Sequence, residues 1–176
     1  PYSSLSRWRI VALLLAVVLL GGLVGVTWAG DYRDGGEIVI GKDQVIDDDL
    51  YVGANRLVIN GIVKGDVLAG ATEIIVNGTV EGDLMGGAQY ITVTGKIGHS
   101  IRAGGMSLVL GPTAAVGHDV LFGGFSLMAA PGSKVAQDLL MGGYQAQLGG
   151  EVGRDVRVGV GALEINGKVG RDVEAT

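Results

Sequence analysis

The stretch Val63-Lys64-Gly65-Asp66-Val67-Leu68-Ala69-Gly70 decides the fold, because variants of it return along the chain at an almost constant spacing. The aspartate at its centre recurs at steps of 17 or 19 residues, and a serine fills one of the slots. These ladder positions are Asp49, Asp66, Asp83, Ser100, Asp119, Asp138, Asp155 and Asp172. A short fixed period is typical of a solenoid, in which each repeat forms one coil and stacked coils bury a shared core.

Each repeat also places apolar residues at fixed distances from its ladder position, namely three before it and one, eight and ten after it. In the repeat of Asp66 these slots hold Val63, Val67, Ile74 and Val76. The last two slots alternate as in a strand. A glycine four after the ladder position, such as Gly70, predicts one corner, and Asn77-Gly78 predicts another. We therefore expect an all-β fold, a single-stranded, three-faced β-helix with coils of about 17 residues.

Two repeats are longer, with their extra residues at Gly111-Pro112-Thr113-Ala114 and Pro131-Gly132-Ser133. Insertions in a solenoid belong at corners, because the strands must stay in register. Glu37-Ile38-Val39-Ile40 fits the strand of a preceding partial coil. The sequence thus predicts a β-helix over residues 37–176, with about eight coils and the last one incomplete, after a linker over residues 30–36.

Residues 1–29 form a different kind of segment, which we expect to be a hydrophobic helix. No charge interrupts the 19 residues from Ile10 to Trp28, Arg7 and Arg9 precede this run, and Trp8 and Trp28 lie at its edges. This length spans a bilayer, and the pattern also fits a secretory signal, so a retained membrane anchor and a cleaved signal peptide are both open. Either way the basic flank stays inside, which predicts a β-helix outside the cytoplasm, secreted if the segment is cleaved.

Composition narrows the functional classes. The chain has 176 residues, 33 of them glycine, no cysteine and a formal net charge of −5. Without cysteine there is neither a disulfide framework nor a thiolate metal site. The chain has no basic stripe and few aromatic residues to stack bases, so we expect no nucleic-acid partner. We also expect no nucleotide and no cofactor.

The ladder carboxylates are the obvious candidates for calcium. One carboxylate per coil is too few for an ion that takes six to eight oxygens, so we expect these aspartates to accept hydrogen bonds from backbone N–H groups. The best acidic cluster is Asp47, Asp48 and Asp49, for which a solvated cap is the alternative.

His99 and His118 share the slot before the ladder position and should stack on an outer corner, without the carboxylate partners of a metal site. The chain also lacks the six-residue subperiod of β-helical acyltransferases and the long loops of β-helical polysaccharide lyases and hydrolases. We therefore do not expect an enzyme.

Large apolar residues gather at outward-facing or corner slots of the fourth to sixth repeats. The predicted interface residues are Leu121, Phe122, Phe125, Met128, Leu140, Met141 and Tyr144. Such a patch would be unusual on a free monomer, which favours a lateral or partner interface. One alternative is core packing of enlarged coils, in which some of these residues, especially those three after the ladder position, point inward. Contact with a membrane surface is the other alternative.

The two ends of the rod offer strand edges that can template another chain. Ile38 and Ile40 lie in the first predicted strand, and Asp172 and Val173 lie in the last repeat. We predict end-to-end pairing through these residues.

The recurring Val-x-Gly-Asp-Val phrase, as in residues 63–67, the coil of about 17 residues and the Asn-Gly corners resemble the bactofilin family of polymer-forming cytoskeletal proteins. The resemblance covers Glu37 to Thr176. It implies a right-handed, three-faced β-helix that polymerises end to end without nucleotide and scaffolds other proteins near membranes.

The apolar N-terminus makes the chain more similar to exported, membrane-anchored relatives of that family. We expect a non-catalytic scaffold whose partners are further copies of itself or membrane and envelope proteins. The alternative is a monomeric exported solenoid that binds envelope glycan or a membrane protein complex.

Overall fold

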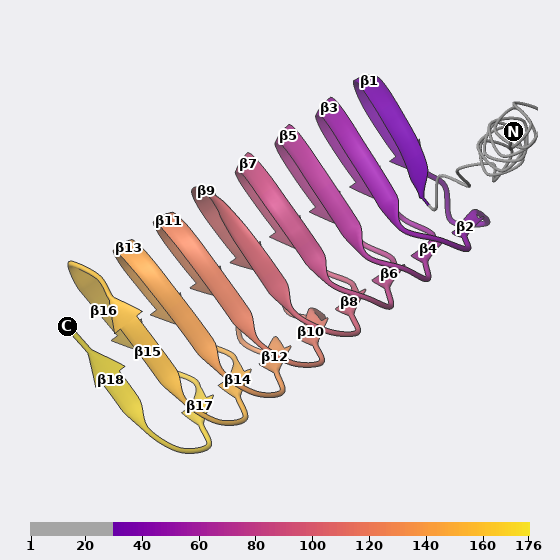
Figure 1. The fold of residues 1–176 in the computed structure, drawn as a ribbon. Helices are drawn as coiled ribbons and strands as arrows, with labels where there is room; N and C mark the ends of the chain where they lie inside the picture. Colours follow the sequence, from indigo (N-terminus) through magenta and orange to yellow (C-terminus); the bar gives the residue numbers. More distant parts are fainter. Residues whose placement is uncertain (1–29) are drawn as a thin grey trace, which may run out of the picture.

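The computed structural model describes residues 30–176, and these form a parallel β-solenoid of about 9 turns with coils of about 17 residues (Figure 1). The long strands lie side by side along the rod, the short strands form a second row, and the described chain runs from one end of the rod to the other. The predicted all-β solenoid is confirmed. The predicted hydrophobic helix falls on residues 1–29, outside the described residues.

Two sheets extend along the rod. The 10-stranded sheet contains β1 (Asp31–Ile40), β3 (Leu50–Ile59), β5 (Val67–Val76), β7 (Leu84–Val93), β9 (Ile101–Leu110), β11 (Val120–Ala129), β13 (Leu139–Leu148), β15 (Val156–Gly159), β16 (Ala162–Ile165) and β18 (Val173–Ala175). The 8-stranded sheet contains β2 (Val45–Ile46), β4 (Ile62–Val63), β6 (Thr79–Val80), β8 (Lys96–Ile97), β10 (Ala115–Val116), β12 (Lys134–Val135), β14 (Glu151–Val152) and β17 (Lys168–Val169).

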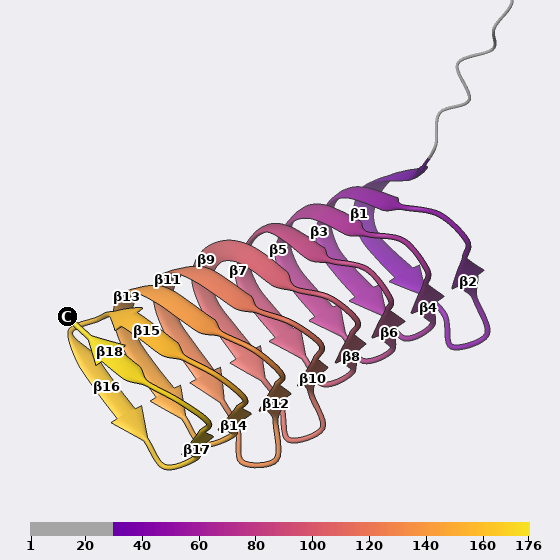
Figure 2. The same ribbon diagram turned by 60° about the horizontal axis from the view of Figure 1, so that its bottom comes forward.

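Equivalent slots of neighbouring coils stack on one another. In the pairing of β3 with β5, Leu50 lies beside Val67 and Ile59 beside Val76, and the pairing skips only the residue six after the ladder position. Each long strand bends at this point, as Figure 2 shows. In the coil of Asp155 the bend separates β15 from β16. The corner therefore lies two residues beyond the predicted one.

The glycines explain why the predicted position of this corner was wrong. Gly70 and Gly142, four after their ladder positions, have extended backbone, and an added Cβ would meet no atom within 4 Å. A Cβ on Gly105, five after Ser100, would instead collide with the carbonyl oxygen of Ala88. The glycine of the Asn77-Gly78 corner is needed for the same reason, because its Cβ would strike the carbonyl oxygen of Gly61.

The core consists of the predicted apolar rows, together with a row three after the ladder position. Val63, Val67, Ile74 and Val76 are all at most 1% exposed, and the same slots are buried in the neighbouring coils. Burying one such aliphatic side chain contributes about 1.5–3 kcal/mol, so the stacked rows supply the main stabilising energy of the rod.

The extra residues of the longer coils form tight turns between a long and a short strand. The Ala114 N–H donates to the Gly111 carbonyl at 3.0 Å, and the Ser133 N–H donates to the Ala130 carbonyl at 3.0 Å. Strand pairing continues on both sides of these turns, so the prediction that the insertions lie at corners is confirmed. Gly132 in the second turn has a φ of 96°, which disfavours any residue with a side chain.

The first coil begins earlier than the sequence indicated. β1 starts at Asp31, which pairs with Leu50 of β3, so most of the predicted linker over residues 30–36 is strand. Asp31 and Arg33 occupy slots that are apolar in the following coil, where Leu50 and Val52 are buried. Because these two slots hold charged rather than apolar residues, the apolar pattern did not reveal the start of the solenoid.

Candidate functional site

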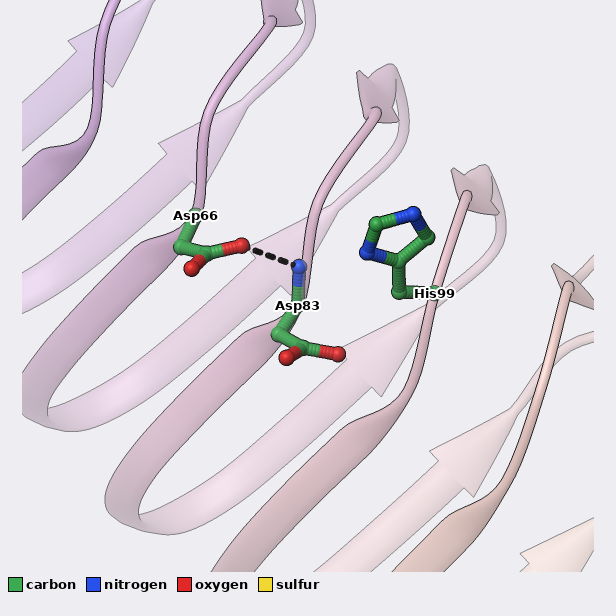
Figure 3. Close-up of side chains that lie close together, drawn as sticks. All are labelled: Asp66, Asp83 and His99. Atoms are coloured by element: carbon green, nitrogen blue, oxygen red, sulfur yellow. Dashed lines mark hydrogen bonds between the residues drawn. The ribbon is translucent and has the colours of Figure 1, made fainter.

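The ladder aspartates accept backbone hydrogen bonds along the rod, as the sequence predicted. The Asp66 Oδ1 accepts the N–H of Asp83 at 2.7 Å (Figure 3). The Asp83 Oδ1 in turn accepts the N–H of Ser100 at 2.8 Å. The pattern continues from Asp49 to Asp172. Two links are longer: the Asp119 N–H donates to the Ser100 hydroxyl at 3.4 Å, and the Asp172 N–H donates to the Asp155 Oδ1 at 3.3 Å. The ladder thus fastens each coil to the next.

The acidic cluster of Asp47, Asp48 and Asp49 is divided among three different partners. Asp47 forms an ion pair of 2.6 Å with Lys64, and its hydrogen bond raises the pKa of that lysine. Asp48 accepts the N–H of Asp49 at 2.8 Å, and Asp49 itself accepts from Asp66. Each of the three carboxylates therefore already has a protein partner.

A different group of possible metal ligands forms where the ladder passes His99. One ligand atom from each of Asp66, Asp83 and His99 lies within 4.8 Å of the other two (Figure 3). The expectation that the histidines lack carboxylate neighbours was therefore wrong, because stacking brings the carboxylates of the two preceding coils beside His99.

The carboxylates beside His99 are already engaged by protein groups. The Asp83 Oδ2 accepts from the Arg102 Nη1 at 3.0 Å, while Asp83 Oδ1 and Asp66 Oδ1 accept backbone N–H groups. A bound metal would have to share Asp83 with a guanidinium charge. The histidine stack is as predicted, since the His99 and His118 rings lie 5.1 Å apart at an interplanar angle of 5°. We therefore assign this corner to coil stacking.

Only some of the residues of the predicted apolar interface lie at the surface. Phe122 and Met141, both three after a ladder position, are 1% and 3% exposed and belong to the core. They are an error of register, because strand alternation turns the residue three after to the same side as the residue one after. Leu140 is half-buried.

The other predicted interface residues are exposed: Leu121 by 49%, Phe125 by 50%, Met128 by 41% and Tyr144 by 56%. Phe125 and Tyr144 occupy the bend of β11 and β13, where the strand pairing skips a residue. Their rings stack with centroids 4.9 Å apart. Met106, in the same slot of the preceding coil, is 53% exposed. We call Met106, Phe125 and Tyr144 the aromatic ridge.

The aromatic ridge is convex, so it can enter a groove of another molecule rather than enclose a small ligand. Leu121 lies on β11 before the bend and Met128 lies after it, so apolar surface flanks the ridge on both faces. The core of the rod is already filled by other side chains, so this exposed apolar surface is of the kind that contact with a protein or a membrane would cover.

A shallow groove of about 470 Å³ lies on the other half of the rod and was not anticipated. Its walls include Tyr32, Tyr51 and Leu68, and its floor includes Gly53 and Gly70. The Tyr32 and Tyr51 rings stack with centroids 4.8 Å apart. The sequence carried a signal for this stack, since both tyrosines follow the ladder slot by two residues, but the late predicted start of the solenoid hid it.

The residues predicted to pair end to end lie at opposite ends of the long sheet, in β1 and around β18. Ile40 is fully buried and Ile38 is packed against the core, whereas Asp172 and Val173 are exposed. The predicted anchor residues Arg7, Trp8, Arg9 and Trp28 lie outside the described residues. Within residues 30–176, no helix has the length and hydropathy needed to cross a membrane.

No protein-family model, curated protein or solved structure matches the chain. The resemblance to bactofilins therefore stays a prediction from the repeat phrase, the coil length and the corners. What defines the molecule is its architecture, a β-solenoid with an aspartate ladder and an exposed aromatic ridge.

Proposed function

We propose that this chain is a non-catalytic structural scaffold, a right-handed, three-faced rod that joins further copies or membrane and envelope proteins. The rod would stand outside the cytoplasm, held at the membrane by residues 1–29, and would be secreted if that segment is a cleaved signal. These statements extend the sequence-based expectations and the resemblance to bactofilins.

The observation that carries the proposal is the aromatic ridge. Phe125 and Tyr144 are each at least half exposed, although the buried rows beneath them are complete. Large apolar side chains at a bend contribute little to the rod itself, since the pairing of strands and the packing of the core continue without them. Their removal from water by a partner would give a favourable contribution to association.

Backbone pairing offers a second means of association. Every coil pairs in parallel with the next, so an uncovered coil presents the donors and acceptors that another coil requires. Val173 and Ala175 in the last described coil are exposed, whereas the equivalent Val156 and Val158 of the preceding coil are buried. A second copy or a partner strand could cover them.

The test compares the full wild-type chain with the variant Phe125→Ser/Tyr144→Ser in a mild detergent by sedimentation velocity. The proposal predicts association of the wild type that rises with concentration, and a marked loss of it in the variant. A matched control, Thr72→Ser, changes the same slot in a coil without an aromatic residue and should behave as wild type. A wild type that sediments as a single rod at every concentration would contradict self-association.

The groove beside Tyr32 and Tyr51 favours the second candidate, a monomeric binding module for envelope glycan or a membrane protein complex. It combines aromatic walls with the charged groups of Arg33 and Asp34, which suits a ligand with both apolar faces and polar edges. If the wild type is monomeric, binding of isolated envelope glycan to Tyr51→Ala and wild-type chains would test this candidate.

A further inference from the structure

The N-terminal edge of the rod, which consists of β1 and β2, differs from the inner coils at its inward-facing slots. Asp31 stacks on Leu50 and Arg33 stacks on Val52, and both of these partners are buried. The rows below them are apolar, for example Val67 and Leu84 in the row of Leu50. The edge thus places two charges directly over the end of the core.

These two charges form a close pair. The Arg33 Nη2 donates to the Asp31 Oδ2 at 2.8 Å, and the Arg33 Nε lies 3.2 and 3.3 Å from the two carboxylate oxygens. The hydrogen bond with Asp31 raises the pKa of Arg33, which keeps the guanidinium charged. Both side chains keep contact with water, with exposed fractions of 27% and 34%. The pair therefore covers Leu50 and Val52 while it remains solvated itself.

Side chains of the first coil also satisfy backbone donors that inner coils satisfy through a neighbouring coil. In the inner coils, the N–H of a ladder residue donates to the carboxylate of the ladder residue one coil earlier. The ladder position one coil before Asp49 is Gly30, which has no carboxylate, so the side chain of Asp48 accepts the Asp49 N–H instead. At the next corner the Gly41 N–H donates to the Gln44 Oε1 at 2.7 Å. In the following coil the equivalent donor, the Asn60 N–H, bonds to the Ile40 carbonyl.

Another coil stacked on this edge would have to bury the Asp31–Arg33 pair between apolar layers. Removing an ion pair from water is costly, and the added coil would bring apolar side chains in return. Inward-pointing charges are one means by which natural sheets keep an edge from adding strands, and the donors bonded to Asp48 and Gln44 are no longer free to pair with an added strand. The three devices occupy different parts of one coil, so they act together.

We propose that the N-terminal edge is closed to strand addition, so that a second copy of this chain pairs with the rod elsewhere. The aromatic ridge lies on β9, β11 and β13, away from the closed edge, and remains available for docking. This inference rests on the proposed function only in taking a second copy as the partner.

The experiment restores the apolar residues of the next coil in the full chain with Asp31→Leu/Arg33→Val. Because the chain has no cysteine, a single Val39→Cys or Glu164→Cys substitution can carry a pyrene label. Val39 and Glu164 occupy the same slot in the first coil and the coil of Asp155. Stacking of a first coil on another first coil, or on that distal coil, brings two labels close enough for excimer emission.

We expect no excimer from wild-type rods labelled at Val39, whether alone or mixed with rods labelled at Glu164. The Asp31→Leu/Arg33→Val variant should give excimer emission, at a half-maximal concentration at least about tenfold below any signal of the wild type. The control Asp34→Leu adds an apolar side chain to an outward slot of β1 and should match the wild type. Circular dichroism melting verifies that each variant folds.

Two results would overturn the closed edge: wild-type excimer emission, or a folded Asp31→Leu/Arg33→Val variant with no gain over Asp34→Leu. The outcomes separate this inference from the proposed self-assembly. Wild-type rods that associate through Val39-labelled edges would uphold self-assembly and refute the closed edge. Wild-type rods that never associate, with a variant that does, would uphold the closed edge and refute self-assembly.

Discussion

Replacing Asp66 by alanine tests whether the ladder fastens coils through hydrogen bonds of its carboxylates. The Asp66 Oδ1 accepts the N–H of Asp83 at 2.7 Å, and none of the ion pairs among residues 30–176 involves Asp66. The backbone N–H of Asp66 still donates to Asp49 in the variant, so one bond is lost. Leaving a buried donor unpaired costs about 1–3 kcal/mol, and the half-buried position of Asp83 places the expected loss near 1–2 kcal/mol.

The matched variant Asp66→Asn keeps an acceptor oxygen and removes the charge. Neighbouring ladder carboxylates one coil apart, about 4.8 Å, repel by roughly 3–4 kcal/mol at an effective dielectric of 20 before screening. The hydrogen bond becomes weaker when its acceptor loses the negative charge, but the repulsion from the carboxylates of Asp49 and Asp83 is lost at the same time and offsets this. We expect Asp66→Asn to lie close to the wild type, and closer still at low ionic strength.

Urea unfolding followed by circular dichroism measures the difference. With a slope of about 1–3 kcal/mol per molar urea, Asp66→Ala should lower the midpoint by roughly 1 M. Unfolding of a solenoid can proceed coil by coil, so the midpoint of the first transition is compared. An unchanged Asp66→Ala variant would refute the hydrogen-bond role. An Asp66→Asn variant as unstable as Asp66→Ala would show that the negative charge itself is required, as for a bound cation.

Further predictions concern the core, the glycines and metal ions. Phe122→Ala should destabilise the rod by about 3–5 kcal/mol, whereas Phe125→Ala should cost at most about 1.5 kcal/mol, the contribution of its ring stack with Tyr144; urea midpoints that coincide would contradict the assigned register. Gly78→Ala should unfold at lower urea than Gly142→Ala, since only the first Cβ strikes a backbone carbonyl; equal midpoints would count against close coil approach at the Asn-Gly corner. Excess EDTA should leave the thermal midpoint unchanged, and a fall that calcium or zinc reverses would assign a metal to the ladder.

The apolar positions of this fold can be predicted from the sequence because stacked coils place the same kind of residue at the same position in every repeat. The rows of Val67 and Ile74 recur in every full coil, which fixed the period, the core and the corner insertions. The position of the bend was not readable. The glycine four after the ladder position, such as Gly70, is extended and faces outward, while the position one residue later holds alanine, glycine or valine in different coils.

The functional surface was less predictable for three physical reasons. Phe122 follows the buried Val120 by two residues, so strand alternation turns it into the core, and its assignment to the surface overlooked that alternation. The closed edge was hidden because Asp31 and Arg33 replace the apolar residues by which a coil is recognised. The neighbours of His99 come from two other coils, so they follow only from the stacking geometry.

Negative-stain electron microscopy of the full wild-type chain tests the scaffold function most directly, over a range of concentrations and with excess EDTA. The account predicts particles of several joined rods that become more frequent with concentration and persist in EDTA, because apolar contacts and backbone pairing hold them. Single rods at every concentration, or joined rods that separate when EDTA is added, would contradict it.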